Sequence, residues 1–141
     1  MKRTALLTGA AGKIGRYVIG ALSRRGFEVV ATDITSHRVP LDVRFEHCDL
    51  TDAAAVDALF AASAATLFVN NAAAQPVQPL EGMDIDAWRG VLQANLDGPF
   101  LLVQQAARAW GARGGAIVNV ASIEGSDPAA GHAHYATSKA G

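Results

Sequence analysis

The chain has 141 residues, enough for one domain with a sizeable core, and half of them are apolar while 18% are charged, which excludes a disordered chain. Its formal net charge of −1 excludes the strongly basic surface that nucleic-acid binding requires, and the single cysteine, Cys48, excludes an internal disulfide. The apolar segment near the start is broken by Gly9 and Gly12, and no apolar run reaches the roughly 18 residues of a membrane span. We therefore expect a cytoplasmic protein that does not bind membranes.

The first expected elements are a buried strand, a glycine turn and a helix. Residues 4–8 (TALLT) form a short apolar run, as expected of a strand that is buried on both faces. In the following TGAAGKIG, Gly9 permits a tight turn, Gly12 lets a pyrophosphate approach the backbone, and Gly15 lets the helix lie close to the strand. The start of the helix offers free N–H groups to phosphate. This order of elements predicts a dinucleotide site, although glycines at this spacing can also form a plain turn.

The second expected strand, residues 27–32 (FEVVAT), is followed by Asp33, 18 positions after Gly15. A carboxylate at the end of that strand accepts hydrogen bonds from the ribose hydroxyls of adenosine and repels a 2′-phosphate. Asp33 therefore favours NAD over NADP. The alternative is an aspartate that only starts a turn, and the neighbouring Arg38 could still change the preference.

Two more strands are expected at residues 44–48 and 66–69, with a helix between them. Asp49, after the first of these strands, is either a turn residue or a partner for an adenine amino group. Asn70 and Asn71 follow the second strand and precede three alanines. They suit a strand end where side-chain amides tie loops together and a ligand lies against the backbone.

A long helix is expected from Asp84 or Asp86 onward, and it contains Asn95, a residue that is unfavourable inside a helix. Pro99, four residues later, has no N–H to donate to the Asn95 carbonyl. If the helix continues through Pro99, that carbonyl is free to hold a water molecule. The alternative is a proline that ends or bends the helix, and the sequence favours neither.

Residues 116–121 form the fifth expected strand and lead to Ser122, which Tyr135 and Lys139 follow at offsets of 13 and 4 residues. On a shared helix, the offset of four places the phenol and the ammonium on one face, one turn apart. A phenol beside a fixed positive charge ionises more easily, and Ser122 could hydrogen-bond to a substrate oxygen that the phenol protonates or deprotonates. A tyrosine and a lysine at this offset also arise by chance in about one chain in 25 of this composition, so the pair has weight only together with the upstream motifs.

The loop expected over residues 123–133 precedes the tyrosine, and two histidines, His132 and His134, lie at its end. Two histidines without a cysteine or carboxylate partner are a weak metal signal. We expect them at the surface or at the rim of a pocket, and we expect no metal site.

Strands that alternate with helices predict an α/β fold, a doubly wound parallel sheet of the Rossmann type with strand order 3-2-1-4-5 and ligands at the carboxyl ends of the strands. From Thr4 to Gly141 the chain resembles the short-chain dehydrogenase/reductase family, in its compact single-domain branch. The motifs that carry the resemblance are TGAAGKIG, Asp33, CDL, NNAA, ANLDGPF, AIVNVAS and YATSK. Two details depart from it: the glycine spacing is similar to that of the extended, sugar-nucleotide-modifying branch, and Ala73 replaces a usual glycine.

The resemblance implies an NAD-dependent oxidoreductase that moves hydride between NAD(H) and a secondary alcohol or ketone of a small molecule. Asn95 would hold a water of a proton relay, Ser122 would orient the substrate oxygen, and Tyr135 would be the acid–base group. Lys139 would favour the ionised phenol and bind the nicotinamide ribose. The cofactor-binding residues would be Gly9, Gly12, Lys13, Ile14, Gly15, Asp33, Asp49, Leu50, Asn71, Ala72, Tyr135 and Lys139. The complete protein would be a homo-oligomer.

Because the chain stops two residues after Lys139, the resemblance also implies that residues 1–141 form an NAD(P)-binding domain that lacks the last strands and helices of the fold. Two other functions stay open. One is a truncated, non-catalytic nucleotide-binding module, and the other is an extended-branch sugar-nucleotide epimerase or dehydratase. The loops at residues 74–80 and 123–134 indicate only that the substrate site is not strongly basic.

Overall fold

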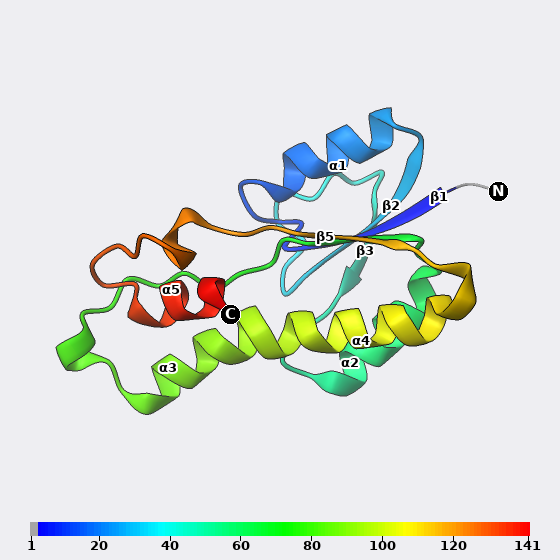
Figure 1. The fold of residues 1–141 in the computed structure, drawn as a ribbon. Helices are drawn as coiled ribbons and strands as arrows, with labels where there is room; N and C mark the ends of the chain where they lie inside the picture. Colours follow the sequence, from blue (N-terminus) through cyan, green and yellow to red (C-terminus); the bar gives the residue numbers. More distant parts are fainter. Residues whose placement is uncertain (1–2) are drawn as a thin grey trace.

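The computed structural model describes residues 3–141, in which five parallel strands form one sheet with helices on both faces (Figure 1). The strand order is β3-β2-β1-β4-β5, which confirms the predicted doubly wound topology. The strands are β1 (Arg3–Thr8), β2 (Phe27–Asp33), β3 (Arg44–His47), β4 (Leu67–Asn70) and β5 (Ala116–Asn119). The α-helices are α1 (Gly15–Arg24), α2 (Ala53–Ser63), α3 (Ile85–Leu92), α4 (Gly98–Trp110) and α5 (Ala133–Ala140).

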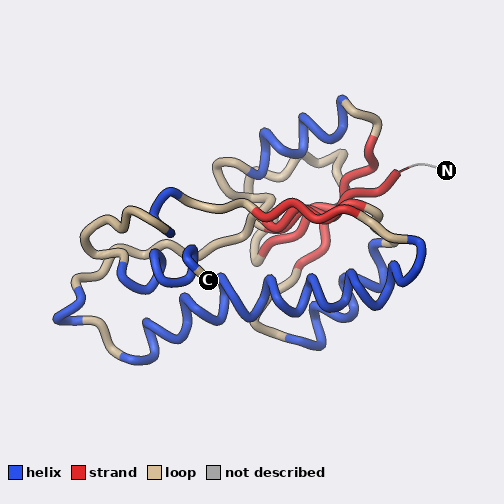
Figure 2. Tube along the Cα trace, in the orientation of Figure 1, coloured by secondary structure: helices blue, strands red, loops and turns tan. Residues whose placement is uncertain are grey.

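The apolar run of β1 is buried on both faces because it forms the middle of the sheet. Leu6 lies between Val30 of β2 and Phe68 of β4, and all three pack into the core on the side of α2 and α4. Leu7, the next residue along the strand, packs into the second core, on the side of α1. Successive side chains of a strand point to opposite faces, so each residue of β1 contributes to a different core. Figure 2 shows the strands as one layer, with α1 on one side and α2 and α4 on the other.

Helices α2 and α3 each begin directly after a capping aspartate. Asp52 accepts hydrogen bonds from the N–H groups of Ala54 and Ala55, and Asp84 accepts one from Ala87. Thus Asp84, not Asp86, begins the long helix. The expected strands are displaced by one or two residues at their ends.

Helix α3 continues into α4 through a wider π-turn, Gln93–Asp97, in which the Gly98 N–H donates to the Gln93 carbonyl five residues earlier. Pro99 stands in the first turn of α4, where a missing N–H costs little. Of the two alternatives for Pro99, the continuing helix is the one observed. Such turns are rare, occur mostly inside α-helices, and are frequent at functional sites.

No helix within residues 3–141 has the length and apolar character needed to cross a membrane.

Candidate functional site

A cleft of about 950 Å³ runs along the carboxyl ends of the strands. Residues that follow every one of the five strands contribute to its walls, together with Tyr135 and Lys139 of α5. The sequence-predicted site residues that line it are Gly9, Gly12, Lys13, Ile14, Asp33, Asp49, Leu50, Asn71, Ala72, Ser122, Tyr135 and Lys139. Two predicted residues, Gly15 and Asn95, are buried and do not line the cleft.

The glycine turn between β1 and α1 is closed by direct backbone contact. Gly9 has a φ of +64°, and a Cβ on it would lie 2.7 Å from the Cα of Ala72. A Cβ on Gly15 would lie 2.4 Å from the Gly9 carbonyl oxygen, so this glycine lets α1 approach the turn. At Gly12 a Cβ would lie 3.1 Å from that same oxygen, and the residue faces the cleft. The first turn of α1 has no side-chain cap. The Tyr17 N–H donates to the Ile14 carbonyl, and the N–H groups before it, of Gly15 and Arg16, stay available to an anion in the cleft.

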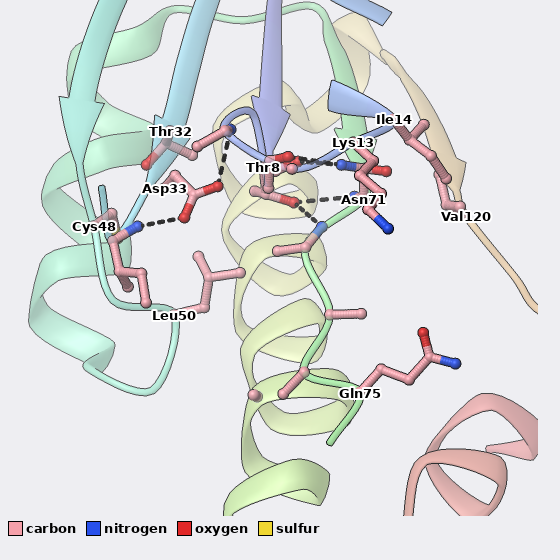
Figure 3. Close-up of a pocket in the computed structure, with 18 of the residues that line it drawn as sticks. Thr8, Lys13, Ile14, Thr32, Asp33, Cys48, Leu50, Asn71, Gln75 and Val120 are labelled. Atoms are coloured by element: carbon pink, nitrogen blue, oxygen red, sulfur yellow. Dashed lines mark hydrogen bonds between the residues drawn. The ribbon is translucent and has the colours of Figure 1, made fainter. Parts of the chain in front are cut away.

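Thr8, at the end of β1, joins this turn to the loop after β4 (Figure 3). Its buried hydroxyl accepts hydrogen bonds from the N–H groups of Asn71 and Ala72, at 3.0 and 3.1 Å. The Asn71 side-chain amide donates in return to the carbonyls of Thr8 and Gly9. The prediction that an asparagine amide ties loops together at this strand end is confirmed for Asn71. Sequence analysis missed Thr8, although a hydroxyl at the end of an apolar strand is a signal for such a role.

The carboxylate of Asp33 is held by backbone N–H groups at the end of β2 (Figure 3). Its Oδ2 accepts from Ala11 at 3.0 Å and its Oδ1 accepts from Ile34 at 2.8 Å. A carboxylate oxygen can accept more than one hydrogen bond. Asp33 is therefore a fixed acceptor at the wall of the cleft, with lone pairs left for a hydroxyl group.

Asp49 forms a turn at the end of β3. Its Oδ1 accepts from the backbone and side chain of Thr51, at 2.9 and 2.8 Å, and these two bonds hold the pKa of Asp49 below its ordinary value. The turn interpretation of Asp49 is thus correct, and the residue also lines the cleft. The next residue, Leu50, is buried at the cleft wall because Gly98 lets α4 approach closely: a Cβ on Gly98 would lie 2.8 Å from the Leu50 Cβ.

Asn95 is buried in the π-turn and binds two other segments through its side chain. Its Oδ1 accepts from the Ala74 N–H at 2.7 Å, and its Nδ2 donates to the Ala74 carbonyl and to the Ser138 hydroxyl, both at 2.9 Å. These bonds connect the loop after β4 to α5. The backbone carbonyl of Asn95 still faces a proline four residues ahead, so the predicted water would have to bind there, because the side chain is fully engaged.

Tyr135 and Lys139 share α5, which confirms the expected one-turn offset. The Lys139 Nζ lies 5.8 Å from the centre of the Tyr135 ring and donates to the Val120 carbonyl at 3.0 Å. Burial lowers the pKa of Lys139 from its ordinary value, since a charged amine is less stable away from water. Ser122 follows β5, and its Oγ accepts a 3.2 Å hydrogen bond from the Glu124 N–H. The hydroxyl, the phenol and the ammonium thus line one part of the cleft.

The two histidines before Tyr135 differ from the expectation. His134 is fully buried, and its Nδ1 accepts a hydrogen bond from the Tyr135 N–H at 2.9 Å, so its expected place at the surface or pocket rim is wrong. His132 is nearly buried and its Nδ1 lies 2.8 Å from the Glu124 carboxylate. The sequence alone could not show this partner, because the loop that joins the two residues has no regular pattern. Among residues 3–141, no group of three histidine, cysteine or acidic side chains is arranged to hold a metal ion.

Comparison with known proteins gives consistent matches. The family model described as short chain dehydrogenase matches residues 3–141. The cis-4-hydroxycyclohexanecarboxylate dehydrogenase of Sinomonas cyclohexanicum is 37% identical, and the alignment covers 99% of this chain and 63% of the relative. The D-threitol dehydrogenase of Mycolicibacterium smegmatis is 34% identical, and the alignment covers 99% of this chain and 60% of that relative.

Solved structures agree with these matches. The crystal structure of a short chain dehydrogenase from Mycobacterium smegmatis superposes with a TM-score of 0.90 at 30% sequence identity. The match covers 99% of this chain and 66% of the solved chain. A 4-hydroxyisoleucine dehydrogenase complexed with NADH gives a TM-score of 0.89 at 26% sequence identity. That match covers 98% of this chain and 63% of the solved chain. The chain therefore spans somewhat less than two thirds of the length of the proteins it matches.

Proposed function

The chain belongs to the short chain dehydrogenase family, and from this premise we propose that it binds NAD(H) and moves a hydride between the nicotinamide and a secondary alcohol or ketone of a small molecule. One observation carries the proposal. The glycine turn and Asp33 lie at one side of the cleft, beside β1 and β2, and Ser122, Tyr135 and Lys139 lie at the other, beside β5. A long cofactor can span these two groups, with its phosphates at the turn and its reacting ring beside the phenol.

The residues present fit a dinucleotide. Gly9 and Gly15 have no room for a side chain, and the uncapped first turn of α1 leaves N–H donors at the cleft, which suits a pyrophosphate. Lys13 and Ile14 lie at this turn and Ala72 lies opposite it. When bound, NAD(H) would supply the site that accepts or donates the hydride.

Asp33 supports a preference for NAD over NADP. Two backbone N–H groups fix its carboxylate, so it can accept from ribose hydroxyls without paying to become ordered. The same negative charge repels a 2′-phosphate. Asp49 and Leu50 would border the adenine on the next strand end.

The chemical step would use the three groups beside β5. Ser122 would donate a hydrogen bond to the substrate oxygen and hold it at the Tyr135 phenol. Tyr135 would take up the hydroxyl proton during oxidation and return it during reduction. Lys139, held by the Val120 carbonyl, would favour the ionised phenol through its charge and would bind the nicotinamide ribose. Asn95 would hold the loop and α5 in place through its side chain, leaving its carbonyl for a water of the proton path.

Replacing the Tyr135 phenol tests this proposal. Tyr135→Phe should lower kcat by about 100- to 10,000-fold, the range expected when a positioned acid–base group is lost, while NADH affinity measured by fluorescence titration stays within about twofold. Tyr17→Phe is the matched control, because Tyr17 is exposed on α1 and, within residues 3–141, its hydroxyl forms a hydrogen bond only with Arg16. The hydroxycyclohexanecarboxylate and threitol of the two relatives are the first substrates to assay.

Unchanged turnover in Tyr135→Phe would contradict the acid–base role. A wild-type chain that binds NADH but oxidises no secondary alcohol would instead favour the non-catalytic nucleotide-binding module.

A further inference from the structure

Three side chains from two loops, the loop after β4 and the loop between β5 and α5, form a hydrogen-bonded chain next to Ser122. The Gln75 Nε2 donates to the Glu124 Oε1 at 3.0 Å, and the His132 Nδ1 lies 2.8 Å from the Glu124 Oε2. Gln75 comes from the loop after β4, Glu124 from the turn after Ser122, and His132 from the residue before α5. The Glu124 and His132 side chains are each 14% exposed, so the carboxylate is largely shielded from water and needs both partners.

The chemistry of Glu124 decides how the Gln75 amide is turned. An ionised carboxylate can only accept hydrogen bonds, so the NH₂ of Gln75 must face Glu124. The carbonyl oxygen of Gln75 consequently faces away from Glu124, and no hydrogen bond to this oxygen is formed within residues 3–141. Gln75 lines the cleft, and Figure 3 shows its side chain extending away from the backbone of its loop.

The side-chain carbonyl oxygen of Gln75 is connected to the part of the cleft that holds Ser122 and Tyr135. The Glu124 N–H donates to the Ser122 Oγ at 3.2 Å. Glu124 is therefore hydrogen-bonded both to Gln75 and to the hydroxyl that would orient the substrate. The Gln78 N–H donates to the Gly131 carbonyl at 2.8 Å, which ties together the loops that carry Gln75 and His132. The His132 ring in turn packs edge-on against the Tyr135 ring, with 5.9 Å between the ring centres. Although Gln75 is exposed, its side-chain bond to Glu124 thus links it to the segment that carries both Ser122 and Tyr135.

We propose that Glu124 is a positioning residue that turns the carbonyl oxygen of Gln75 into the cleft, and that this oxygen accepts a hydrogen bond from a second, non-reacting hydroxyl group of the substrate. The substrate class is then a small molecule with at least two hydroxyl groups. An alcohol with no other polar hydrogen leaves the oxygen unpaired, and a substrate carboxylate in the same place has no hydrogen to donate and is repelled by Glu124. This inference rests on the proposed function.

The test compares butane-2,3-diol with butan-2-ol, which has the same carbon skeleton and lacks the second hydroxyl. The wild-type kcat/KM should favour the diol by about three- to tenfold, as expected for one hydrogen bond. Gln75→Leu should reduce this ratio to about one. Glu124→Gln should reduce it mainly through the KM of the diol, because the amide no longer holds Gln75 in one orientation.

Gln78→Leu is the matched control. Gln78 lies in the same loop, but its side chain donates to the Gly82 carbonyl outside the cleft, so the diol preference should not change. Equal ratios in wild type and Gln75→Leu would overturn the inference.

A binding measurement separates this inference from the proposed function. Calorimetric titration of the NADH-loaded chain with the two alcohols should show the same preference and the same dependence on Gln75. If no alcohol is oxidised but this preference is found, the proposed function fails and the inference stands. If neither turnover nor binding prefers the diol, the inference fails even where butan-2-ol is oxidised.

Discussion

The two sides of the cleft are built in different ways. At the glycine turn, β1 is the central strand, and it is buried from Ala5 to Thr8. At the other side, β5 is the edge strand of the sheet and is exposed throughout, with Val118 49% exposed. The first side combines close backbone approach at Gly9 and Gly15 with the hydrogen bonds of Thr8 and Asn71. The second side has one close approach, where a Cβ on Gly125 would lie 2.6 Å from the Lys139 carbonyl oxygen, and it is joined by side-chain hydrogen bonds of Asn95, Glu124 and Lys139. We therefore expect added volume at Gly15 to damage the first side, and loss of the Asn95 hydrogen bonds to damage the second.

A single added methyl group should break the glycine side. In Gly15→Ala, the Cβ would lie 2.4 Å from the Gly9 carbonyl oxygen and 2.5 Å from that of Ala10, and neither backbone group can move without opening the turn. We expect the free energy of unfolding, measured with urea, to fall by at least about 3 kcal/mol.

Gly20→Ala is the control on the same helix. Its Cβ would meet only the flexible end of Arg24, at 3.3 Å, so the better helix propensity of alanine should raise stability by about 0.5–1 kcal/mol. Equal effects of the two substitutions would show that the close approach of α1 to the turn is not required.

On the other side, Asn95→Ala removes three hydrogen bonds without adding volume. It leaves the N–H and carbonyl of Ala74 and the hydroxyl of Ser138 without this partner, and we expect a loss of about 2–4 kcal/mol in urea unfolding. Asn119→Ala, at the exposed edge strand, removes one longer bond of 3.3 Å to Asn70 and should cost less than about 1 kcal/mol. A smaller loss for Asn95→Ala than for Asn119→Ala would contradict the role of the Asn95 side chain.

Thr8→Val would sharpen the contrast, because it tests a hydroxyl on the side of the glycine turn. Valine has the same shape but leaves the N–H groups of Asn71 and Ala72 unpaired, so stability should fall by about 2 kcal/mol. Thr32→Val is the matched control: both threonines are 1% exposed, but the Thr32 hydroxyl has no hydrogen-bond partner within residues 3–141. Its removal should leave stability unchanged or raise it by up to about 1 kcal/mol, and a loss as large as that of Thr8→Val would show a partner for Thr32.

The sequence predicted the fold well where local patterns are strong. The apolar run of β1, the glycine turn and the one-turn offset from Tyr135 to Lys139 depend on neighbours along the chain, and the structure has all three. The parallel topology follows from the alternation of strands and helices. Element ends moved by one or two residues because hydrogen bonds across the sheet decide where a strand stops.

The candidate site was less predictable where residues far apart in the sequence meet. Asn95 was expected to matter through its carbonyl, yet its side-chain partners come from the loop after β4 and from α5. His134 was expected at the surface or at the rim of a pocket because no ligand partner was evident in the sequence, but the packing of α5 buries it completely. No spacing rule pairs Gln75 with Glu124, since 49 positions separate them and only the fold brings them together.

The π-turn at Gln93–Asp97 also sets the rotational phase of the long helix. Its hydrogen bond from Gly98 to Gln93 encloses one residue more than an ordinary α-helical bond, and each residue of an α-helix turns the chain by about 100°. The α4 side chains therefore face about 100° away from the direction they would take on an uninterrupted continuation of α3. With every residue kept, a regular helix through this segment would rotate Leu102 and Ala106 out of the core, whereas deleting one residue within the π-turn would restore a regular helix and leave their direction unchanged. A one-residue deletion within Gln93–Asp97 should therefore preserve the core packing of α4, whereas a one-residue deletion in α4 before Leu102 should disrupt it.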